Sequence, residues 1–168
     1  MYKRQIEAVY SFQIDLSTSF TGEDSLDISL DAGNAASTSA LGELDLNGTS
    51  EALTVDGISY TFPLGGLTAF VGDATDGSLL YDTACVYDSP TNTLDDCGAQ
   101  VAALGTGSGT AAGASYDFGN GFSGAVGYTG AGSTTSGLFT KEGDDAYGAQ
   151  LTYNGDSFGA SVTYANTE

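Results

Sequence analysis

AAGASYDFGNGFSGAVGYTG, the stretch from Ala111 to Gly130, decides the fold. Next to its central Gly-Asn-Gly, aromatic side chains alternate with polar ones. One set of alternate positions, here called one parity, holds Ala112, Ala114, Tyr116 and Phe118 before the turn, and Phe122, Gly124, Val126 and Tyr128 after it. Period two is typical of β-strands with two unlike faces, and an Asn-Gly dipeptide is typical of a tight hairpin turn. The stretch therefore predicts an antiparallel hairpin.

The same period recurs along most of the chain. It runs through YSFQIDLSTSF at 10–20 and through further segments at 26–31, 53–62, 67–71, 147–153 and 158–164. Counting the short run ELDL at 43–46 gives about nine strands. Because an odd number of strands prevents regular closure, we expect an all-β fold in which an antiparallel sheet is open and curved.

Composition excludes several functional classes. The 168 residues include 22 acidic and three basic side chains, a formal net charge of −19 at pH 7, and no histidine. Without histidine there is neither a Ser-His-Asp or Cys-His nucleophile system nor a histidine-containing zinc or iron site. Three basic residues are too few to neutralise a phosphate backbone, so we expect no nucleic-acid partner. No motif places two carboxylates on a shared cleft, and we expect neither enzymatic activity nor a bound cofactor.

The two faces of the predicted sheet indicate two different solvents. One face is aliphatic and edged by aromatic side chains, as in the lipid-facing band of an outer-membrane β-barrel. The other carries hydroxyl, amide and carboxylate groups, which suit a water-filled lumen. The alternative is a soluble sandwich or solenoid, in which a second layer would cover the apolar face. The aromatic residues assigned to two lipid-facing girdles are Phe118, Phe122, Tyr128, Tyr147, Tyr153, Phe158 and Tyr164.

Most of the chain resembles the barrel domain of cyanobacterial outer-membrane porins, the iron uptake porins related to carbohydrate-selective porins. The strings that carry the resemblance are DLSTSFTGEDSLDISLDAGN, ISYTFPLGG with LTAFVGD, AAGASYDFGNGFSGAVGYTG, LFTKEGDDAYGAQLTY and CVYDSPTNTLDDC. The family's barrels have about sixteen strands, so the resemblance implies a transmembrane β-barrel fragment. It also implies passive transport of small hydrophilic solutes, iron or sugars among them, across the outer membrane. The full-length protein could then assemble as a homotrimer in contact with outer-membrane lipid.

The ends of the chain are interpreted in the same way. Residues 1–5, Met-Tyr-Lys-Arg-Gln, resemble the translated end of a sequencing-library adapter, and we expect 6–168 to be the N-terminal part of a porin barrel domain. With the family's periplasmic N-terminus, the first strand would run outward. The TGED turn would then lie outside the cell, and the PLGG, GNG and NGD turns in the periplasm. The long connection from about Gly72 to Thr110 would lie outside, after the fifth strand.

A second function remains open, a soluble secreted or surface β-domain such as an adhesin module.

The long connection contains both cysteines of the chain, Cys85 and Cys97. In the oxidising environment outside the cytosol, which the rest of the chain indicates, we expect these two residues to form a disulfide. On the chain-entropy model a loop of this size gives roughly 3 kcal/mol of stabilisation.

Aspartates are the candidate pore-lining or constriction residues. An acidic lumen with little opposing charge attracts cations, and we expect the pore to prefer them. The alternative for the long connection is a solvated acidic loop, and its spacing matches no EF-hand. We assign Asp15, Asp27, Asp31 and Asp117 to the polar faces of their strands, and Asp73, Asp76, Asp82, Asp88, Asp95 and Asp96 to the long connection.

Overall fold

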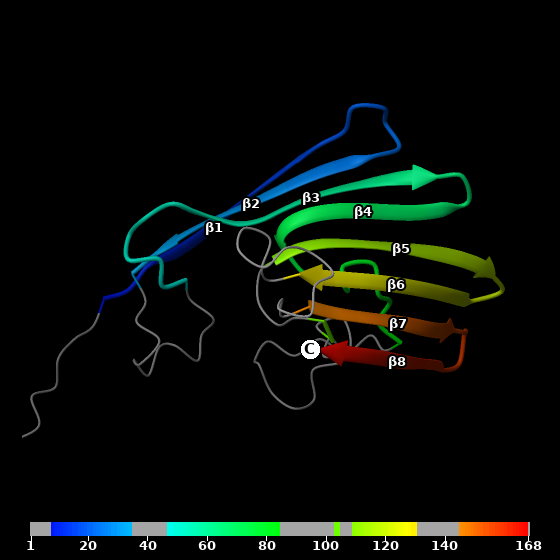
Figure 1. The fold of residues 1–168 in the computed structure, drawn as a ribbon. Coiled ribbons are helices and arrows are strands. Elements are labelled where there is room, and N and C mark those ends of the chain that lie inside the picture. The colour runs from blue at the N-terminus through cyan, green and yellow to red at the C-terminus, as the bar shows by residue number, and fades with distance from the viewer. Residues whose placement is uncertain (1–7, 35–46, 85–102, 105–108, 131–144, 168) are drawn as a thin grey trace, which may run out of the picture.

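The computed structural model describes residues 8–34, 47–84, 103–104, 109–130 and 145–167. These residues form one antiparallel sheet of eight strands in the order of the sequence (Figure 1). The strands are β1 (Ser11–Thr18), β2 (Ser25–Gly33), β3 (Thr54–Leu64), β4 (Leu67–Thr75), β5 (Gly109–Gly119), β6 (Phe122–Gly130), β7 (Asp145–Asn154) and β8 (Gly159–Thr167). The prediction of an all-β, open, curved antiparallel sheet is confirmed. The described residues contain no helix long and apolar enough to cross a membrane.

The register of the strands aligns their alternating patterns into continuous rows. Residues directly opposite each other in an antiparallel pair point to the same face. One row on the apolar face follows the direct partners Ala69, Ala114, Val126, Ala149 and Tyr164 from β4 to β8. From β4 to β8 the sheet thus has one mainly apolar face and one mainly polar face.

The connections at the two ends of the strands differ in length. All four short turns, at 19–24, 65–66, 120–121 and 155–158, lie at one end, the short-turn edge (Figure 1). The long connections, at 34–53, 76–108 and 131–144, leave from the other end, the long-connection edge. The prediction that TGED lies opposite the other three turns is therefore wrong. It counted ELDL as a strand, but β2 pairs directly with β3 and the run at 43–46 lies outside the described residues. The longest connection accordingly follows β4, not a fifth strand.

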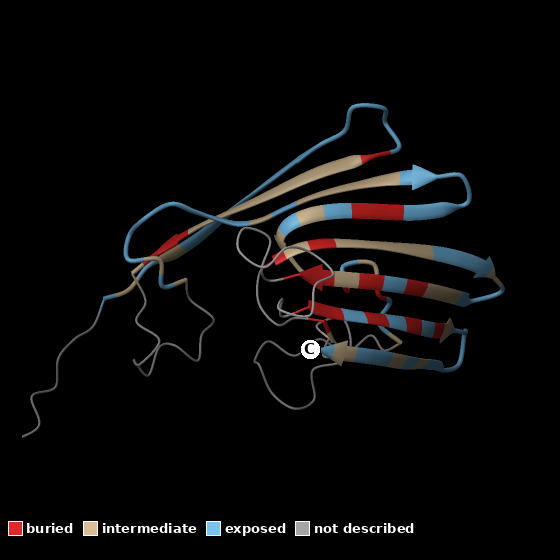
Figure 2. Cartoon of the chain, in the orientation of Figure 1, coloured by how far each residue is buried: buried red, intermediate tan, exposed pale blue. Residues whose placement is uncertain are grey.

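Burial alternates along β6 and β7 (Figure 2), and it is inverted relative to a soluble sheet. In β7 the apolar Tyr147 and Leu151 are about half exposed, whereas the polar Gln150 and Thr152 are buried. Val162 in β8 reaches 74% exposure. No part of the described chain forms a second layer on the apolar face, and the buried residues of β5–β7 lie mainly on the polar face.

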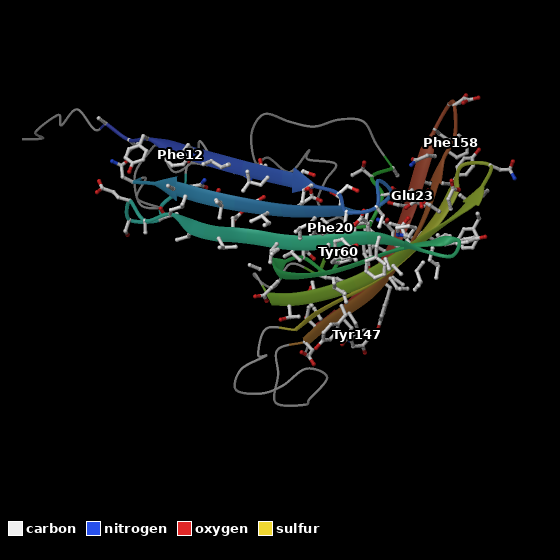
Figure 3. The ribbon with its side chains drawn as sticks, turned by 90° about the horizontal axis from the view of Figure 1, so that it is seen from above. Phe12, Phe20, Glu23, Tyr60, Tyr147 and Phe158 are labelled. Carbon is white, nitrogen blue, oxygen red and sulfur yellow. The ribbon has the colours of Figure 1, made fainter. Side chains whose placement is uncertain are left out.

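The turn between β1 and β2 is built around a buried carboxylate. Asp24, 7% exposed, accepts hydrogen bonds from Ser19 Oγ at 2.7 Å, the Thr21 amide at 2.7 Å and Thr21 Oγ1 at 2.6 Å. Tyr60 of β3 donates its hydroxyl to the same carboxylate at 2.7 Å and stacks edge-on against Phe20, which ties the turn to the sheet (Figure 3). These hydrogen bonds, those of Thr21 and Ser19 foremost, hold the pKa of Asp24 well below its usual range.

Replacing this carboxylate is expected to change how stability depends on pH. Because the pKa is lowered in the folded state, the carboxylate stabilises the fold above the ordinary aspartate pKa of about 3.9, and this contribution is lost as the pH falls further. Asp24→Asn should therefore lower the free energy of unfolding at pH 7 and flatten its decline below pH ~4. Urea unfolding followed by circular dichroism at several pH values measures this.

The matched control is Glu23→Gln in the same turn. The Glu23 side chain is exposed and makes no hydrogen bond among the described residues. This variant should unfold as the wild type does. Equal pH profiles for Asp24→Asn and the wild type would contradict the assigned role of Asp24.

Candidate functional site

Residues 76–84, the inserted segment, leave the end of β4 and lie across the polar face of β5–β8, inside the curve of the sheet (Figure 1). The Gly77 amide donates to Thr129 Oγ1 of β6 at 2.7 Å, and the Asp82 amide donates to Gln150 Oε1 of β7 at 2.7 Å. Both acceptors are buried, Thr129 at 0% and Gln150 at 5% exposure. Two buried side chains of the wall, the part of the sheet formed by β5–β8, therefore hold the inserted segment.

A row of glycines lets the inserted segment approach the wall. Gly113, Gly127 and Gly148 are direct partners on β5, β6 and β7, and all three lie on the polar face. A Cβ atom added at Gly127 would lie 1.8 Å from the Gly77 carbonyl oxygen, closer than any non-bonded contact. A Cβ at Gly148 would lie 3.0 Å from the Tyr81 hydroxyl oxygen. Side chains in this row would force the segment away from the sheet.

Apolar groups fill the space between the inserted segment and the wall. Tyr81 and Leu104 are buried against Ala125 and Ala146 on the polar face of the sheet. Burial, followed by the nearby charge of Asp76, raises the pKa of the Tyr81 hydroxyl to about 12. Tyr81 is therefore neutral at physiological pH and acts as an apolar anchor for the segment.

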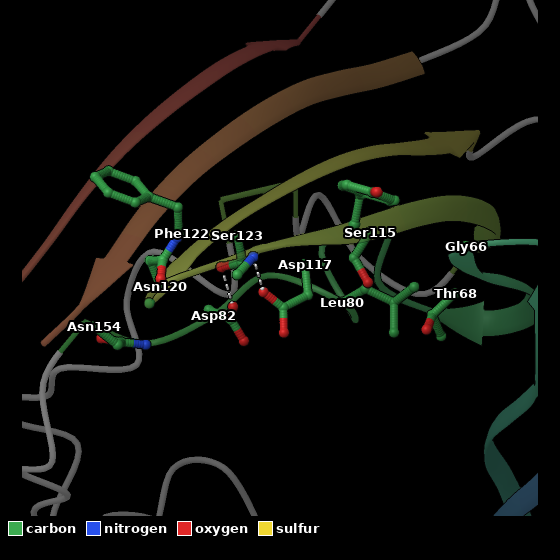
Figure 4. Close-up of a pocket in the computed structure, with 13 residues that line it drawn as sticks. Gly66, Thr68, Leu80, Asp82, Ser115, Asp117, Asn120, Phe122, Ser123 and Asn154 are labelled. Atoms are coloured by element: carbon green, nitrogen blue, oxygen red, sulfur yellow. Dashed lines mark hydrogen bonds between the residues drawn. The ribbon is translucent and has the colours of Figure 1, made fainter.

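A cavity of about 380 Å³ opens between the inserted segment and the short-turn edge of β4–β6 (Figure 4). Asp82 of the segment and Asp117 of β5 both line it. Ser123 Oγ donates to Asp82 Oδ2, and the Gly119 amide donates to Asp117 Oδ1 at 2.7 Å. Its other lining groups include Leu80, Ser115, Asn120 and Asn154. The cavity brings together two carboxylates, hydroxyls, amides and one aliphatic side chain.

The four strand acids lie on the polar face, as their parity predicts. Asp15, Asp27, Asp31 and Asp117 are the direct partners of Ser29, Ser17, Gln13 and Ser123 respectively. Asp15 accepts hydrogen bonds from Ser29 Oγ at 2.6 Å and from Gln13 Nε2 at 3.1 Å. Their role in lining a pore stays a prediction.

The acids assigned to the long connection divide into three groups. Asp76 and Asp82 belong to the inserted segment. Asp73 was assigned wrongly, because it lies within β4 opposite Ile58 and accepts a hydrogen bond from Thr110 Oγ1 at 3.1 Å. The others, Asp88, Asp95 and Asp96, lie outside the described residues together with Cys85 and Cys97, and the disulfide stays a prediction.

The aromatic residues assigned to the girdles lie near the two edges of the sheet. Phe118, Phe122, Tyr147, Phe158 and Tyr164 are exposed, whereas Tyr128 and Tyr153 are half-buried. Tyr153 contacts Phe122 and Phe158 at ring-centroid distances of 4.7 and 5.2 Å, which forms an aromatic cluster beside the short turns. At the opposite edge Tyr128 donates its hydroxyl to Asp145 at 2.9 Å.

Comparison with known proteins found no matching family model, no matching curated protein and no matching solved structure. Within the described residues, no three histidine, cysteine or acidic side chains are placed to hold a metal ion together. The chemistry of the site is therefore that of a polar surface with a segment laid across it. Sequence reasoning identified its polar residues but missed the glycine row. The only signal of this row in the sequence is that glycines recur at the alternate positions that point to the polar face.

Adding a methyl group to the glycine row is expected to destabilise the protein. Gly127→Ala places carbon against the Gly77 carbonyl oxygen, and overpacking of this kind costs about 1–3 kcal/mol. The control is Gly124→Ala on the opposite face of β6, where the new methyl would meet the exposed ring of Phe118 at 3.0 Å. Urea unfolding should give a clearly lower stability for Gly127→Ala. Equal losses in the two variants would mean that the segment is not seated on this row.

Proposed function

We propose that the chain forms part of an outer-membrane porin barrel that lets small hydrophilic solutes and ions diffuse passively. The observation that carries the proposal is the inverted burial of the sheet. Its rows of apolar side chains are exposed, whereas the inserted segment covers rows of polar side chains. In lipid, an uncovered apolar face stabilises the fold, whereas in water it is an aggregation hazard. The difference in length between the connections at the two ends of the strands supports the same proposal, since outer-membrane barrels combine short periplasmic turns with long external loops.

Under this proposal the four short turns face the periplasm, and the connection that carries Cys85 and Cys97 lies outside. β1 would then run inward, from the long-connection edge to the short-turn edge. The two aromatic edges would lie at the two membrane interfaces, where amphipathic rings are favoured. The polar face, with its cavity, would line the water-filled path.

The charge of this path favours cations. Lys3, Arg4 and Lys141 are the three basic residues of the chain, and all lie outside the described residues. Six acids named above, Asp15, Asp27, Asp31, Asp76, Asp82 and Asp117, lie on the polar face or on the segment across it. A confined aqueous space lined by one sign of charge concentrates counter-ions and repels co-ions. We therefore infer cation preference, hydrated metal ions included.

A lysine on the apolar face distinguishes a lipid-facing sheet from a soluble domain. Val126 is 55% exposed in the middle of β6, so in a soluble protein Val126→Lys should change stability little. At the mid-plane of a bilayer the same change costs about 2–4 kcal/mol. The control is Thr68→Lys, on the exposed polar face of β4. Urea unfolding of the intact protein from lipid vesicles should show a loss for Val126→Lys alone. Unchanged stability of Val126→Lys would favour the soluble alternative.

The transport proposal is tested by the reversal potential of the intact porin in a planar bilayer under a KCl gradient. We expect a potential on the cation-selective side, which grows as both salt concentrations are lowered because screening weakens. The absence of conductance would reject the channel. An anion-selective potential would reject the inferred charge preference while leaving the channel in place.

A further inference from the structure

We propose that the two lateral edges of the sheet, the outer sides of β1 and β8, dock against a second copy of this chain, so that two copies of the eight strands close one barrel of sixteen. The inference rests on the proposed function, because it names the partner that completes the same channel. It follows from the chemistry of the two lateral edges, from the stagger of the strands and from what lies inside the curve of the sheet.

Both lateral edges are open in the part of the chain that the structure describes. β1 and β8 are the first and last strands of the sheet, and no described residue pairs with the outer side of either (Figure 1). Unpaired backbone groups are costly in the hydrocarbon region of a bilayer, so only closed sheets span it. A sheet whose apolar face meets lipid therefore needs a partner at both lateral edges.

The two edge strands lack the features that keep exposed strands from pairing. Such strands usually carry lysine, proline, several charges or a β-bulge. β8 contains no charged residue and no proline, and Asp15 is the single charged residue of β1, which also lacks proline. The ladders β1–β2 and β7–β8 run without a register shift, whereas the interior ladders β2–β3, β4–β5 and β5–β6 are interrupted. Both lateral edges are therefore suited to pairing with another strand.

The eight described strands leave too little room to close on themselves. An eight-stranded barrel has an interior just wide enough for side chains. Here the inserted segment adds a stretch of backbone to that interior, and Tyr81 and Leu104 are buried beside it on the polar face. A barrel of about sixteen strands leaves an aqueous channel. The inserted segment thus requires more strands than these eight.

A second copy fits both lateral edges because β1 and β8 run in opposite directions. The ladders are antiparallel throughout and the described strands are even in number. When the short turns of both copies lie at the same side of the membrane, β8 of one copy is therefore antiparallel to β1 of the other. The same contact forms twice, as two-fold symmetry requires, and no lateral edge stays open.

The stagger of the strands selects the register of this contact. Direct partners lead from Thr18, at the short-turn end of β1, across every ladder to Asn166, near the long-connection end of β8. A contact with Val162 opposite Ile14 of the second copy continues this stagger at about one residue per strand, which is a tilt of roughly 35°, as in closed barrels. A shift of one residue would turn apolar side chains toward the polar face.

The side chains of the two edge strands are complementary in this register. On the polar face Ser161 lies opposite Asp15 of the second copy, and Thr163 lies opposite its Gln13. Each carboxylate or amide of β1 thus meets a hydroxyl of β8, and no two carboxylates oppose each other. Directly opposite pairs of this kind stabilise a ladder, whereas like charges would weaken it. The apolar rows of the two copies join on the other face.

The test uses the 168-residue chain in lipid vesicles, with Cys85 and Cys97 replaced by serine. Ile14→Cys combined with Val162→Cys should give a product of twice the chain mass with a short thiol cross-linker, because the two positions lie opposite each other. Gln13→Cys combined with Val162→Cys is the matched control. Its two side chains point to opposite faces, so it should stay at the mass of one chain. Equal yields of the double-mass product would overturn the proposal.

The other products of the cross-linking also decide. A bond within one chain would show that the eight strands close on themselves. A ladder of higher multimers would show open-ended association of the lateral edges. The absence of any cross-link would leave these edges to other strands, further strands of the same polypeptide among them. Each of these three results overturns the second copy as the partner.

A second measurement needs no cysteine. If a channel requires two copies, the number of channels formed by dilute wild-type chain in a planar bilayer should fall about fourfold when its concentration is halved, because the assembly follows mass action. A fall of only about twofold would mean that one chain forms the channel. That result would overturn the proposal even where the cysteine variants fail to fold.

These outcomes separate the inference from the function on which it rests. A double-mass cross-link in protein that never conducts rejects the channel and supports the contact between copies. A conducting wild type without the double-mass cross-link rejects the second copy alone.

Discussion

The carbonyl oxygen of Gly77 occupies the place where a side chain at Gly127 would begin, and much of the structure depends on this approach. The paired glycines of β5–β7 form a strip of bare backbone across the polar face. The inserted segment lies against that strip, donates its amides to Thr129 and Gln150, and thereby covers polar groups that a soluble sheet would expose. Burial of Thr129 and Gln150 is tolerated because both side chains are hydrogen-bonded. The apolar face is left with no protein layer over it in the described chain.

The apolar core of the described residues is small. Few of these residues are hydrophobic and buried, and several of those are alanines, whereas large apolar side chains such as Leu151, Val162 and Phe158 are more than half exposed. At about 25 cal/mol per Å², exposed apolar area of this kind is stabilising only where something apolar covers it. A bilayer would supply that cover, which is why the burial pattern supports the proposed location. The same sheet would then offer its hydroxyls and carboxylates to water.

Much of the fold could be predicted from the sequence because its signal is local. Period-two alternation and the Asn-Gly turns predict the hairpins β5–β6 and β7–β8 from neighbouring residues alone. The edge of the TGED turn was predicted wrongly, because the prediction counted a further strand between two segments that pair directly in the sheet as β2 and β3. Asp73 was misplaced for a similar reason, since β4 extends past Gly72 to Thr75. The path of residues 76–84 depends on contacts with β6 and β7, far along the chain, and no local pattern encodes it.

The central claim is that the residues along one strand alternate between facing lipid and facing water. It is tested most directly by a spin label placed in turn at residues 160–164 of β8, in intact protein with Cys85 and Cys97 replaced by serine, in lipid vesicles. Collision with oxygen, which concentrates in the bilayer, should be high at 160, 162 and 164, and collision with a water-soluble nickel complex should be high at 161 and 163. Loss of this alternation, or high nickel collision at 162, would contradict the account.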